Sequence, residues 1–415
     1  MSQVRVHSEI APIEKVIIHT PGRELELMTP DSAEEVLYDD ILNLQNARQQ
    51  HAQLSGVLKK VTRPFEVRDL LRDILEDDQV RQSLVEDLCR KLDVEHHRQD
   101  LLDLDPETLT EQLITGTPIK RNTLQRYLSK NQFAIPPLPN LFFTRDAAMV
   151  VNNFALLGNM ATLVRTTETY IMRYLFLHHP ELSCADHHLV DTTLLHSSKG
   201  TFEGGDLLIL RKDVLVIGMS ERTNPAGIDY LIEHFKKEGE VKHLFVVMLP
   251  KHRAWIHLDM VFTMIDYDKA VVFPPLINER NAVDVIHVDI SKKDAPRFSR
   301  HDYLLEALKE VDIHLEPVYC GGTDPLYQQR EQWQSGANFF TIAPGKIIGY
   351  GMNYYTYEEL ARAGIPRIEA RDVLDGTVNL DDYDKYAIAM AGNELTRGGG
   401  GCRCMTMPIV RADDA

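Results

Sequence analysis

Short apolar segments recur in pairs along the chain, and a short turn joins the two members of each pair. The pairs occupy residues 4–22, 146–160, 206–220, 260–275 and 338–353. Four of the turns (Asn-Asn, Arg-Lys-Asp, Asp-Tyr-Asp-Lys and Ala-Pro-Gly-Lys) have compositions typical of tight turns. Helical patterns follow three pairs, and two of those patterns end at a glycine. We predict an α/β fold of five repeated units around an axis, although unrelated hairpins are also common in large α/β proteins.

One long segment departs from this pattern, because it is polar, charged and helical in period. Val67, Leu70, Leu71, Ile74 and Leu75 fall on one face of a helix. Asp105-Pro106 gives a helix start and Gly116 a helix stop. We therefore predict that residues 67–127 form a small all-helical insertion between the first hairpin and the second.

Length and charge restrict the class of function. The chain has 415 residues, with 45 Lys and Arg against 62 Asp and Glu, so its formal net charge is −17. A protein that binds polyanions normally carries a basic face, so nucleic acid and anionic membrane are poor candidate partners, whereas a small cation would be attracted. The N-terminus lacks a signal pattern, no apolar run approaches a membrane span, and the five cysteines are sparse. These features predict a cytoplasmic protein.

Polar side chains precede three of the hairpins, and equivalent units would bring them to one rim. They are Asn140 and Asp146, Glu203 and Asp206, and His257 and Asp259. Carboxylates gathered with a histidine are costly unless they bind a cation or a metal. If residues 257–259 form a strand, the two side chains of His-Leu-Asp share a face. Each piece alone also has a structural interpretation, such as a plain Gly-Gly-Asp turn beside a solvated Glu203.

The C-terminal segment carries the strongest chemical signal. Four consecutive glycines, residues 398–401, lead to Cys402 and Cys404. A glycine run is entropically costly and suits a loop that folds closely over a ligand. A thiol beside cationic groups, with a histidine available, is typical of an activated nucleophile. The alternative is a Cys-x-Cys metal site with His257, but further spaced ligands are lacking.

A second segment rich in possible metal ligands is residues 178–188, HHPELSCADHH. Its histidines fall at a predicted helix end, where such residues are common for electrostatic reasons. The chain has no phosphate-binding loop or dinucleotide fingerprint. We therefore expect no cofactor and no metal.

Taken together, these motifs resemble those of the arginine deiminases. The resemblance runs from PLPNLFFTRD through FEGGD, HLDMVFTMID, and the GGTDP and REQW region to the terminal Gly-rich CMTMPIVR. That family belongs to the guanidino-modifying, or pentein, superfamily. The resemblance implies a five-bladed, pseudo-symmetric ββαβ propeller, which agrees with the five repeated units. It also implies an additional helical insertion, residues 66–131, within a single catalytic domain that spans residues 1–415.

The resemblance also implies roles for individual residues. It makes Cys404 the nucleophile and His257 the general acid/base, and it makes the carboxylates around the substrate guanidinium Glu203, Asp146 and Asp259. It implies further substrate contacts from Arg165 and Arg222 to the α-carboxylate, from the pocket residue Asn140, and from the position of Gly399. Some family members have an arginine where this chain has Gly399, and Arg397 is the nearest replacement. Cys402 replaces a small residue or proline.

The function implied is the hydrolysis of free L-arginine to citrulline and ammonia without a cofactor. An amidinotransferase would share the covalent first half of this reaction but would pass the amidino group to an amine. A third possibility is a protein that binds cationic amino acids without turnover. Symmetry favours an even-numbered homo-oligomer, a dimer or tetramer.

Overall fold

The computed structural model describes residues 3–28, 38, 40–129, 131–184, 188–192, 200–292 and 294–413. The fold is α/β, and its named strands form six sheets. Five of these sheets share one topology, in which an antiparallel pair is followed by a third strand parallel to the second. In that order the five sets are β5 (Ala148–Val151), β6 (Phe154–Leu157) and β7 (Leu189–Asp191); β8 (Leu207–Arg211), β9 (Val214–Met219) and β10 (His243–Met248); β11 (Phe262–Asp266), β12 (Lys269–Val272) and β15 (Glu316–Tyr319); β16 (Phe340–Ala343), β17 (Lys346–Tyr350) and β19 (Tyr386–Met390); and β20 (Met407–Arg411), β1 (Ile13–Ile18) and β2 (Arg63–Glu66).

Four of the five predicted hairpins are confirmed, and the first is wrong. Residues 4–22 contribute one strand, β1, whose antiparallel partner is β20 at the other end of the chain. Arg5 and Val6 make only isolated bridges, to Val410 and Asn152. The first repeat is therefore completed by the C-terminus, which places the residues just before β20 among the residues that precede the other hairpins.

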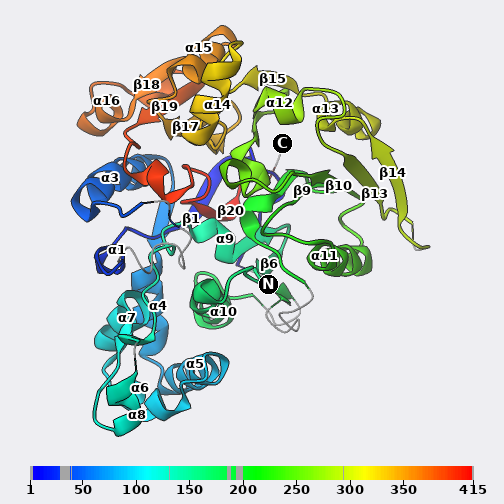
Figure 1. Ribbon diagram of the computed structural model, residues 1–415. Coiled ribbons are helices and arrows are strands. Elements are labelled where there is room, and N and C mark those ends of the chain that lie inside the picture. The colour runs from blue at the N-terminus through cyan, green and yellow to red at the C-terminus, as the bar shows by residue number, and fades with distance from the viewer. Residues whose placement is uncertain are drawn as a thin grey trace.

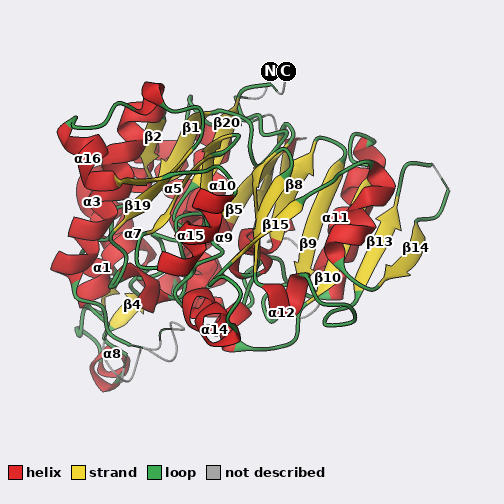
Figure 2. Ribbon diagram, turned by 90° about the horizontal axis from the view of Figure 1, so that it is seen from above, coloured by secondary structure: helices red, strands yellow, loops and turns green. Residues whose placement is uncertain are grey.

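Additional strands and helices complete the sheets. β13 (Val285–Asp289) and β14 (Arg297–His301) extend the second set, β18 (Arg367–Glu369) extends the fourth, and β3 (Thr117–Pro118) pairs with β4 (Phe133–Ile135). The helices predicted after three hairpins are confirmed as α10 (Thr166–His178), α11 (Pro225–Glu238) and α15 (Tyr354–Arg362). Helices also lie outside the strands in Figure 2, among them α3 (Leu44–Val61) and α16 (Ala370–Asp375). The shorter helices are α1 (Arg23–Glu26), α12 (Pro274–Ile277), α13 (Leu304–Ala307) and α14 (Pro325–Trp333).

A group of helices extends away from the sheets (Figure 1). It consists of α4 (Val67–Leu75), α5 (Asp78–Lys91), α6 (Arg98–Leu102), α7 (Pro106–Thr115) and α8 (Leu124–Leu128). The five apolar residues that define one face of α4 are all buried, as their spacing predicts. Asp105 caps α7 by accepting from the Thr108 N–H, and Gly116 follows at φ +93°.

Short helical turns stand before the hairpins and position the polar residues found there. They are α9 (Thr144–Ala147) before β5, and the 3-10 turns η5 (Gly204–Asp206) before β8 and η7 (Leu258–Met260) before β11. η5 contacts both α9 and η7, so the three turns gather at one place. The 3-10 turn η10 (Leu395–Gly398) opens the glycine-rich segment that leads to β20. Among the described residues no helix is long and apolar enough to cross a bilayer.

Candidate active site

The structure brings Asp146, Glu203, His257, Asp259 and Cys404 into the interior, where all five side chains are buried. Asp146 comes from α9, Glu203 lies at the start of η5, and His257 and Asp259 belong to the η7 turn. The expectation that residues 257–259 form a strand is wrong, because the chain makes a 3-10 turn there before β11 begins. The polar side chains still come together at one rim, because they lie on the short turns that precede the hairpins.

The Cys404 thiol is held by an amide side chain that sequence analysis did not identify. Asn338 Nδ2 donates to Cys404 Sγ at 3.2 Å and to the Asp259 carbonyl at 3.1 Å. Asn338 Oδ1 accepts from the backbone N–H groups of Arg403 and Cys404, at 3.0 and 3.2 Å. One amide therefore fixes both the backbone and the sulfur of Cys404.

The surroundings of this thiol are acidic, which differs from the cationic environment expected for it. Cys404 Sγ lies 3.6 Å from Asp259 Oδ2. Burial raises the pKa of the Cys404 thiol well above its usual value, and Asp259 and Asp146 raise it further. The neighbouring Arg403 directs its guanidinium to Asp259 and Glu9, at 2.8 and 2.9 Å, and only weakly opposes this effect. The thiol is therefore neutral in the unliganded site.

A histidine–carboxylate pair forms the second part of the site. His257 Nε2 lies 2.9 Å from Glu203 Oε2, and His257 Nδ1 lies 3.8 Å from Asp146 Oδ1. Burial alone would lower the pKa of His257, but Asp146 and the hydrogen bond to Glu203 raise it to about 9. His257 is thus an imidazolium at neutral pH and is able to donate a proton.

Arg165 is held among the carboxylates rather than left open for an anion. Its guanidinium lies 2.8 Å from Asp146 Oδ2, 2.8 Å from Glu168 Oε2 and 3.9 Å from Glu203 Oε2. All four side chains are buried. A planar guanidinium therefore already occupies one edge of Asp146, which shows that this carboxylate is oriented to receive such a group.

Two carboxylate oxygens remain without a hydrogen bond in this buried cluster. Asp146 Oδ1 and Asp259 Oδ1 are both inaccessible to solvent, and neither has a hydrogen-bond partner among the described residues. An unsatisfied carboxylate oxygen is costly in a protein interior. The two oxygens therefore indicate a binding position for a cationic group that donates hydrogen bonds.

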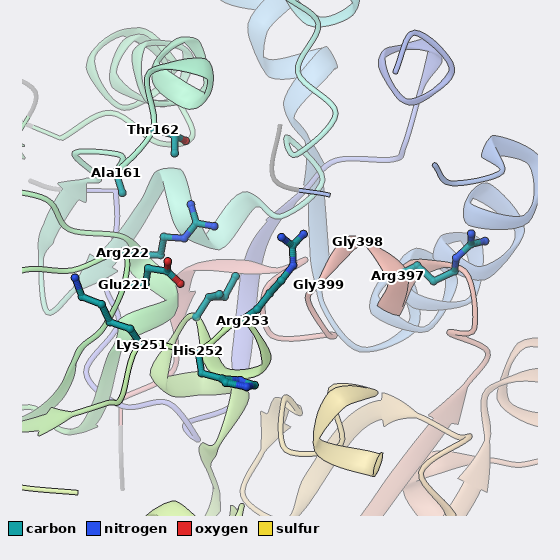
Figure 3. Close-up of a pocket in the computed structure, with 11 residues that line it drawn as sticks. Ala161, Thr162, Glu221, Arg222, Lys251, His252, Arg253, Arg397, Gly398 and Gly399 are labelled. Atoms are coloured by element: carbon teal, nitrogen blue, oxygen red, sulfur yellow. The ribbon is translucent and has the colours of Figure 1, made fainter. Parts of the chain in front are cut away.

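A cavity of about 520 Å³ is connected to this cluster through a residue of its wall. Figure 3 shows Arg222, Lys251 and Arg253 around it, with Gly399 on the glycine-rich segment. The backbone N–H of Ala161, which also lines the cavity, donates to Glu203 Oε1 at 3.0 Å and so links cavity and cluster. Arginine and lysine outnumber the single acidic residue, Glu221, in the cavity wall, whereas the buried cluster is acidic.

Two glycines permit close approaches that hold the site together. A Cβ on Gly205 would lie 2.5 Å from His257 Nδ1, and a Cβ on Gly401 would lie 2.7 Å from Asn338 Oδ1. In the Gly-Gly pair, Gly205 therefore packs against the catalytic candidate His257, and Gly204 packs against the Arg145 backbone. Gly399 alone in the run 398–401 has a left-handed φ, +85°.

The remaining predicted residues lie nearby with other contacts. Asn140 is buried in the segment leading into α9. Arg397 lines the cavity, but its guanidinium pairs with Glu394 at 2.9 Å and with Asp40. Cys402 is buried and directs Sγ to Met390 Sδ at 3.4 Å, so it is turned toward the core.

The geometry also tests the metal alternatives. Asp146, Glu203 and His257 offer ligand atoms within 4.8 Å of one another, but the Arg165 guanidinium already pairs with both carboxylates. Cys402 and Cys404 do not join such a group with His257 among the described residues. In the segment 178–188, His187 lies outside the described residues, and the described part contributes to no such group.

Asn338 lies just before the first strand of a sheet, as the other residues of the site do. Asp146 and Asp259 lie just before the first strands of their hairpins, β5 and β11, and Cys404 lies just before β20. Asn338 lies in the same way two residues before β16. Asn338 is thus the polar residue at the start of the last predicted hairpin, residues 338–353. The signal that identifies Asp146 and Asp259 in the sequence, a polar residue just before a hairpin, also identifies Asn338.

Solved structures with the same fold carry bound small molecules. A variant of the N-terminal domain of ArgZ, covalently bound to a reaction intermediate, matches with a TM-score of 0.53 at 13% identity, over 96% of this chain and 98% of that one. A variant of dimethylarginine dimethylaminohydrolase, as its adduct with S-methyl-L-thiocitrulline, matches with a TM-score of 0.51 at 15% identity, over 95% and 99%. Both neighbours are pentein proteins, so the molecule has an α/β fold of the pentein type.

The sequence comparisons are more specific than the fold. A family model described as arginine deiminase matches residues 34–411. The arginine deiminase of Bacillus cereus (strain ATCC 10987 / NRS 248) is 32% identical, and the alignment covers 99% of both chains. The chain therefore belongs to the arginine deiminase family and is a hydrolase of the guanidino group, which confirms the resemblance seen in its motifs.

Proposed function

We propose that the protein hydrolyses free L-arginine to citrulline and ammonia through a covalent intermediate on Cys404. The observation that carries this proposal is the pair of buried oxygens, Asp146 Oδ1 and Asp259 Oδ1, that lack hydrogen bonds beside a buried thiol. Two carboxylates can hold a guanidinium planar and aim its central carbon at the sulfur. The matched relatives are arginine deiminases, which supports arginine as the substrate.

Substrate binding requires a rearrangement of charges. The substrate guanidinium takes the place at Asp146 that the Arg165 guanidinium now holds at 2.8 Å. Arg165, still paired with Glu168, then turns toward the α-carboxylate. Arg222 lines the cavity, and its buried Nε has no hydrogen-bond partner among the described residues, so it is a second group for the same carboxylate. Asn140 and the backbone at Gly399 complete the pocket in this proposal.

The substrate itself promotes ionisation of the thiol. Burial and two carboxylates raise the pKa of Cys404 in the empty site. A bound guanidinium neutralises Asp146 and Asp259, so the thiolate becomes accessible once arginine is in place. The thiol proton leaves to solvent, and the sulfur attacks the central guanidinium carbon. Unoccupied enzyme thereby keeps an unreactive thiol.

His257 serves both halves of the reaction. As an imidazolium, paired with Glu203 at 2.9 Å, it gives its proton to the departing nitrogen as the C–N bond breaks and ammonia leaves. The product of this half is an amidino thioether on Cys404. Neutral His257 then takes a proton from water, which attacks the same carbon. The C–S bond breaks, the remaining hydroxyl proton passes to the departing sulfur, and citrulline leaves, so that the neutral thiol and the imidazolium of the unliganded site are restored.

The architecture that holds this site is also part of the proposal. We infer that the five repeated sheets form a five-bladed ββαβ propeller with pseudo-symmetry, because each repeats one antiparallel pair and one parallel strand. Residues 66–131 are then an insertion within a single catalytic domain, residues 1–415. The repeated topology explains why site residues come from the segments before successive strand pairs.

The direct test measures ammonia and citrulline after L-arginine is added, with and without glycine as an acceptor amine. We expect stoichiometric ammonia and citrulline in both cases. We also expect Cys404→Ala to abolish turnover and Cys402→Ala, which removes a thiol facing Met390, to retain most of it. Arginine-dependent transfer to glycine without ammonia would instead indicate an amidinotransferase. Binding without either product would indicate a binding protein.

A further inference from the structure

Three histidines lie in a diagonal row on one face of the five-stranded sheet, away from the active site. They are His243 on β10, His287 on β13 and His301 on β14. Figure 1 shows β14 at the outer edge of the molecule, with β13 and then β10 further in. In the register of these antiparallel strands, His287 pairs with Phe245, and His301 pairs with Val285. His243 lies two residues from Phe245, the partner of His287, and His287 lies two residues from Val285, the partner of His301. Residues two apart on a strand share a face, so all three histidines lie on the same face.

A glutamate from a neighbouring turn faces this row. Glu310 belongs to the 3-10 turn η8 (Leu308–Val311), and its Oε2 lies 3.5 Å from His287 Nδ1 and 3.7 Å from His301 Nε2. The ligand atoms of the three residues all lie within 4.8 Å of one another. Zinc bonds of about 2.0–2.2 Å to nitrogen and oxygen imply ligand separations of about 3.3–3.5 Å in a tetrahedral site. The two measured contacts to Glu310 are close to that separation.

Further contacts orient the His287 ring. Phe245 stacks on it, with ring centroids 4.4 Å apart and planes 10° apart. His287 Nε2 lies 3.0 Å from His243 Nδ1. When Nε2–H donates to His243, the lone pair of His287 Nδ1 points to the Glu310 side. Such an outer hydrogen bond is the usual companion of a metal-bound histidine.

The basic side chains around the row have acidic partners of their own. Arg300 donates to Asp284 at 3.0 Å, Arg297 lies 2.8 Å from Asp289, and Lys309 lies 2.8 Å from Glu306. The ion pairs that Glu310 makes with described residues are both to histidine. The charge at this point therefore favours a cation, because Glu310 faces two imidazoles while Lys309 and the two arginines are engaged elsewhere. The Ser299 hydroxyl, 3.2 Å from His301 Nε2, is the contact that the cation would displace.

We propose that His287, His301 and Glu310 bind a divalent transition-metal cation of the zinc class. Two imidazoles and one carboxylate suit zinc better than magnesium or calcium, which prefer oxygen ligands. His287 is buried and Glu310 is exposed, so the cation reaches the site from solvent and keeps a water as its fourth ligand. The site holds the β13–β14 edge hairpin to η8, and it takes no part in the reaction proposed at Cys404.

The test measures zinc content. Chelator-treated protein is dialysed against ZnCl₂, and bound zinc is counted by elemental analysis in wild type, His301→Gln, Glu310→Gln and the control His96→Gln. His96 is an exposed histidine in the helical group, far from the sheet edge. We expect each of the two ligand variants to bind one zinc ion per chain fewer than wild type, and the control to bind as many as wild type. Zinc bound elsewhere, for example at the active-site thiol, is common to all four proteins and cancels.

Two further readouts separate a metal site from a cluster of hydrogen bonds. His243→Ala removes only the outer partner and should weaken zinc affinity about 10–100-fold. Zinc should also slow amide hydrogen exchange across residues 285–301 in wild type but not in His301→Gln. Wild-type zinc content in either ligand variant would overturn the proposal and leave an ordinary hydrogen-bonded cluster. Circular dichroism of each variant establishes that a loss of zinc is not a loss of fold.

Discussion

Replacing Arg403 by methionine should destabilise the protein strongly, because this guanidinium compensates two buried carboxylates. Arg403 lies 2.9 Å from Glu9 Oε1 and 2.8 Å from Asp259 Oδ2, and all three side chains are buried. Methionine keeps much of the volume of the side chain but leaves both acids without a cation. The free energy of unfolding should therefore fall at neutral pH.

Two routes give a similar magnitude for this loss. Breaking a buried ion pair by removing one partner typically costs about 3–5 kcal/mol. Independently, burial raises the pKa of Glu9, but Arg403, with smaller effects from Arg145 and Arg411, outweighs this and lowers it from 4.5 to about 2. At about 1.4 kcal/mol for each pKa unit, that difference corresponds to about 3 kcal/mol. We expect Arg403→Met to lose about 3–5 kcal/mol at pH 7.

The sign of the pH dependence follows from the same shift. The folded pKa of Glu9 is lowered, so its contribution is present above about pH 4.5 and is lost as the pH falls toward 2. Wild type should therefore lose this stability over that interval. Arg403→Met has already lost the part that depends on Arg403, so the difference between the two proteins should shrink as the pH is lowered.

Arg145 offers a matched control, since it is a second buried arginine in the same region. It makes no ion pair within 4 Å of a carboxylate among the described residues, and its Nε donates to the Arg403 carbonyl at 3.4 Å. Burial and the nearby Arg403 lower its pKa to about 9. Urea unfolding at pH 7 should show a smaller loss for Arg145→Met. A loss at Arg403→Met that is no larger would refute the reasoning.

Three further outcomes are expected. Agmatine lacks the α-carboxylate, and each charged hydrogen bond that is lost costs about 1.5–3 kcal/mol. The kcat/KM for agmatine should therefore be at least about tenfold below that for arginine. Equal values would contradict the roles of Arg165 and Arg222. Gly205→Ala places a methyl against His257 and should lower kcat while the protein still folds; unchanged kcat would show that the ring position is not critical. The pKa of His257 in the unliganded enzyme is raised to about 9, and the proton donor must be charged, so kcat/KM should fall as the pH rises through that value. A kcat/KM that continues to rise there would contradict the role of His257 as proton donor.

Local signals in the sequence were sufficient for much of the fold. The turn residues between β5 and β6 or between β8 and β9, and the cap pair Asp105 and Gly116 around α7, act over a few positions and were predicted correctly. The pairing of β1 with β20 could not be predicted in this way, because its partners lie at opposite ends of the chain. Nothing near residue 4 or residue 407 specifies that partner.

The site shows the same division. The polar residues before the hairpins were visible because they interrupt apolar segments, and Asn338 follows the same rule. The charge around Cys404 was not predictable from its neighbours in the sequence, because it comes from Asp146 and from Asp259, which lies 145 positions away. Arg403 pairs with Glu9 and Asp259, so the environment of the thiol is acidic although the adjacent residue is basic.

Intact mass measurement of His257→Asn mixed with L-arginine tests the covalent role of Cys404 most directly. Without the base, hydrolysis should slow more than attack by the thiolate, so the amidino-enzyme should accumulate. We predict an arginine-derived mass on the peptide that contains Cys404, and its absence when Cys404→Ser is added to the same protein. Citrulline formation by the Cys404→Ser single variant at a rate near that of wild type would contradict the account.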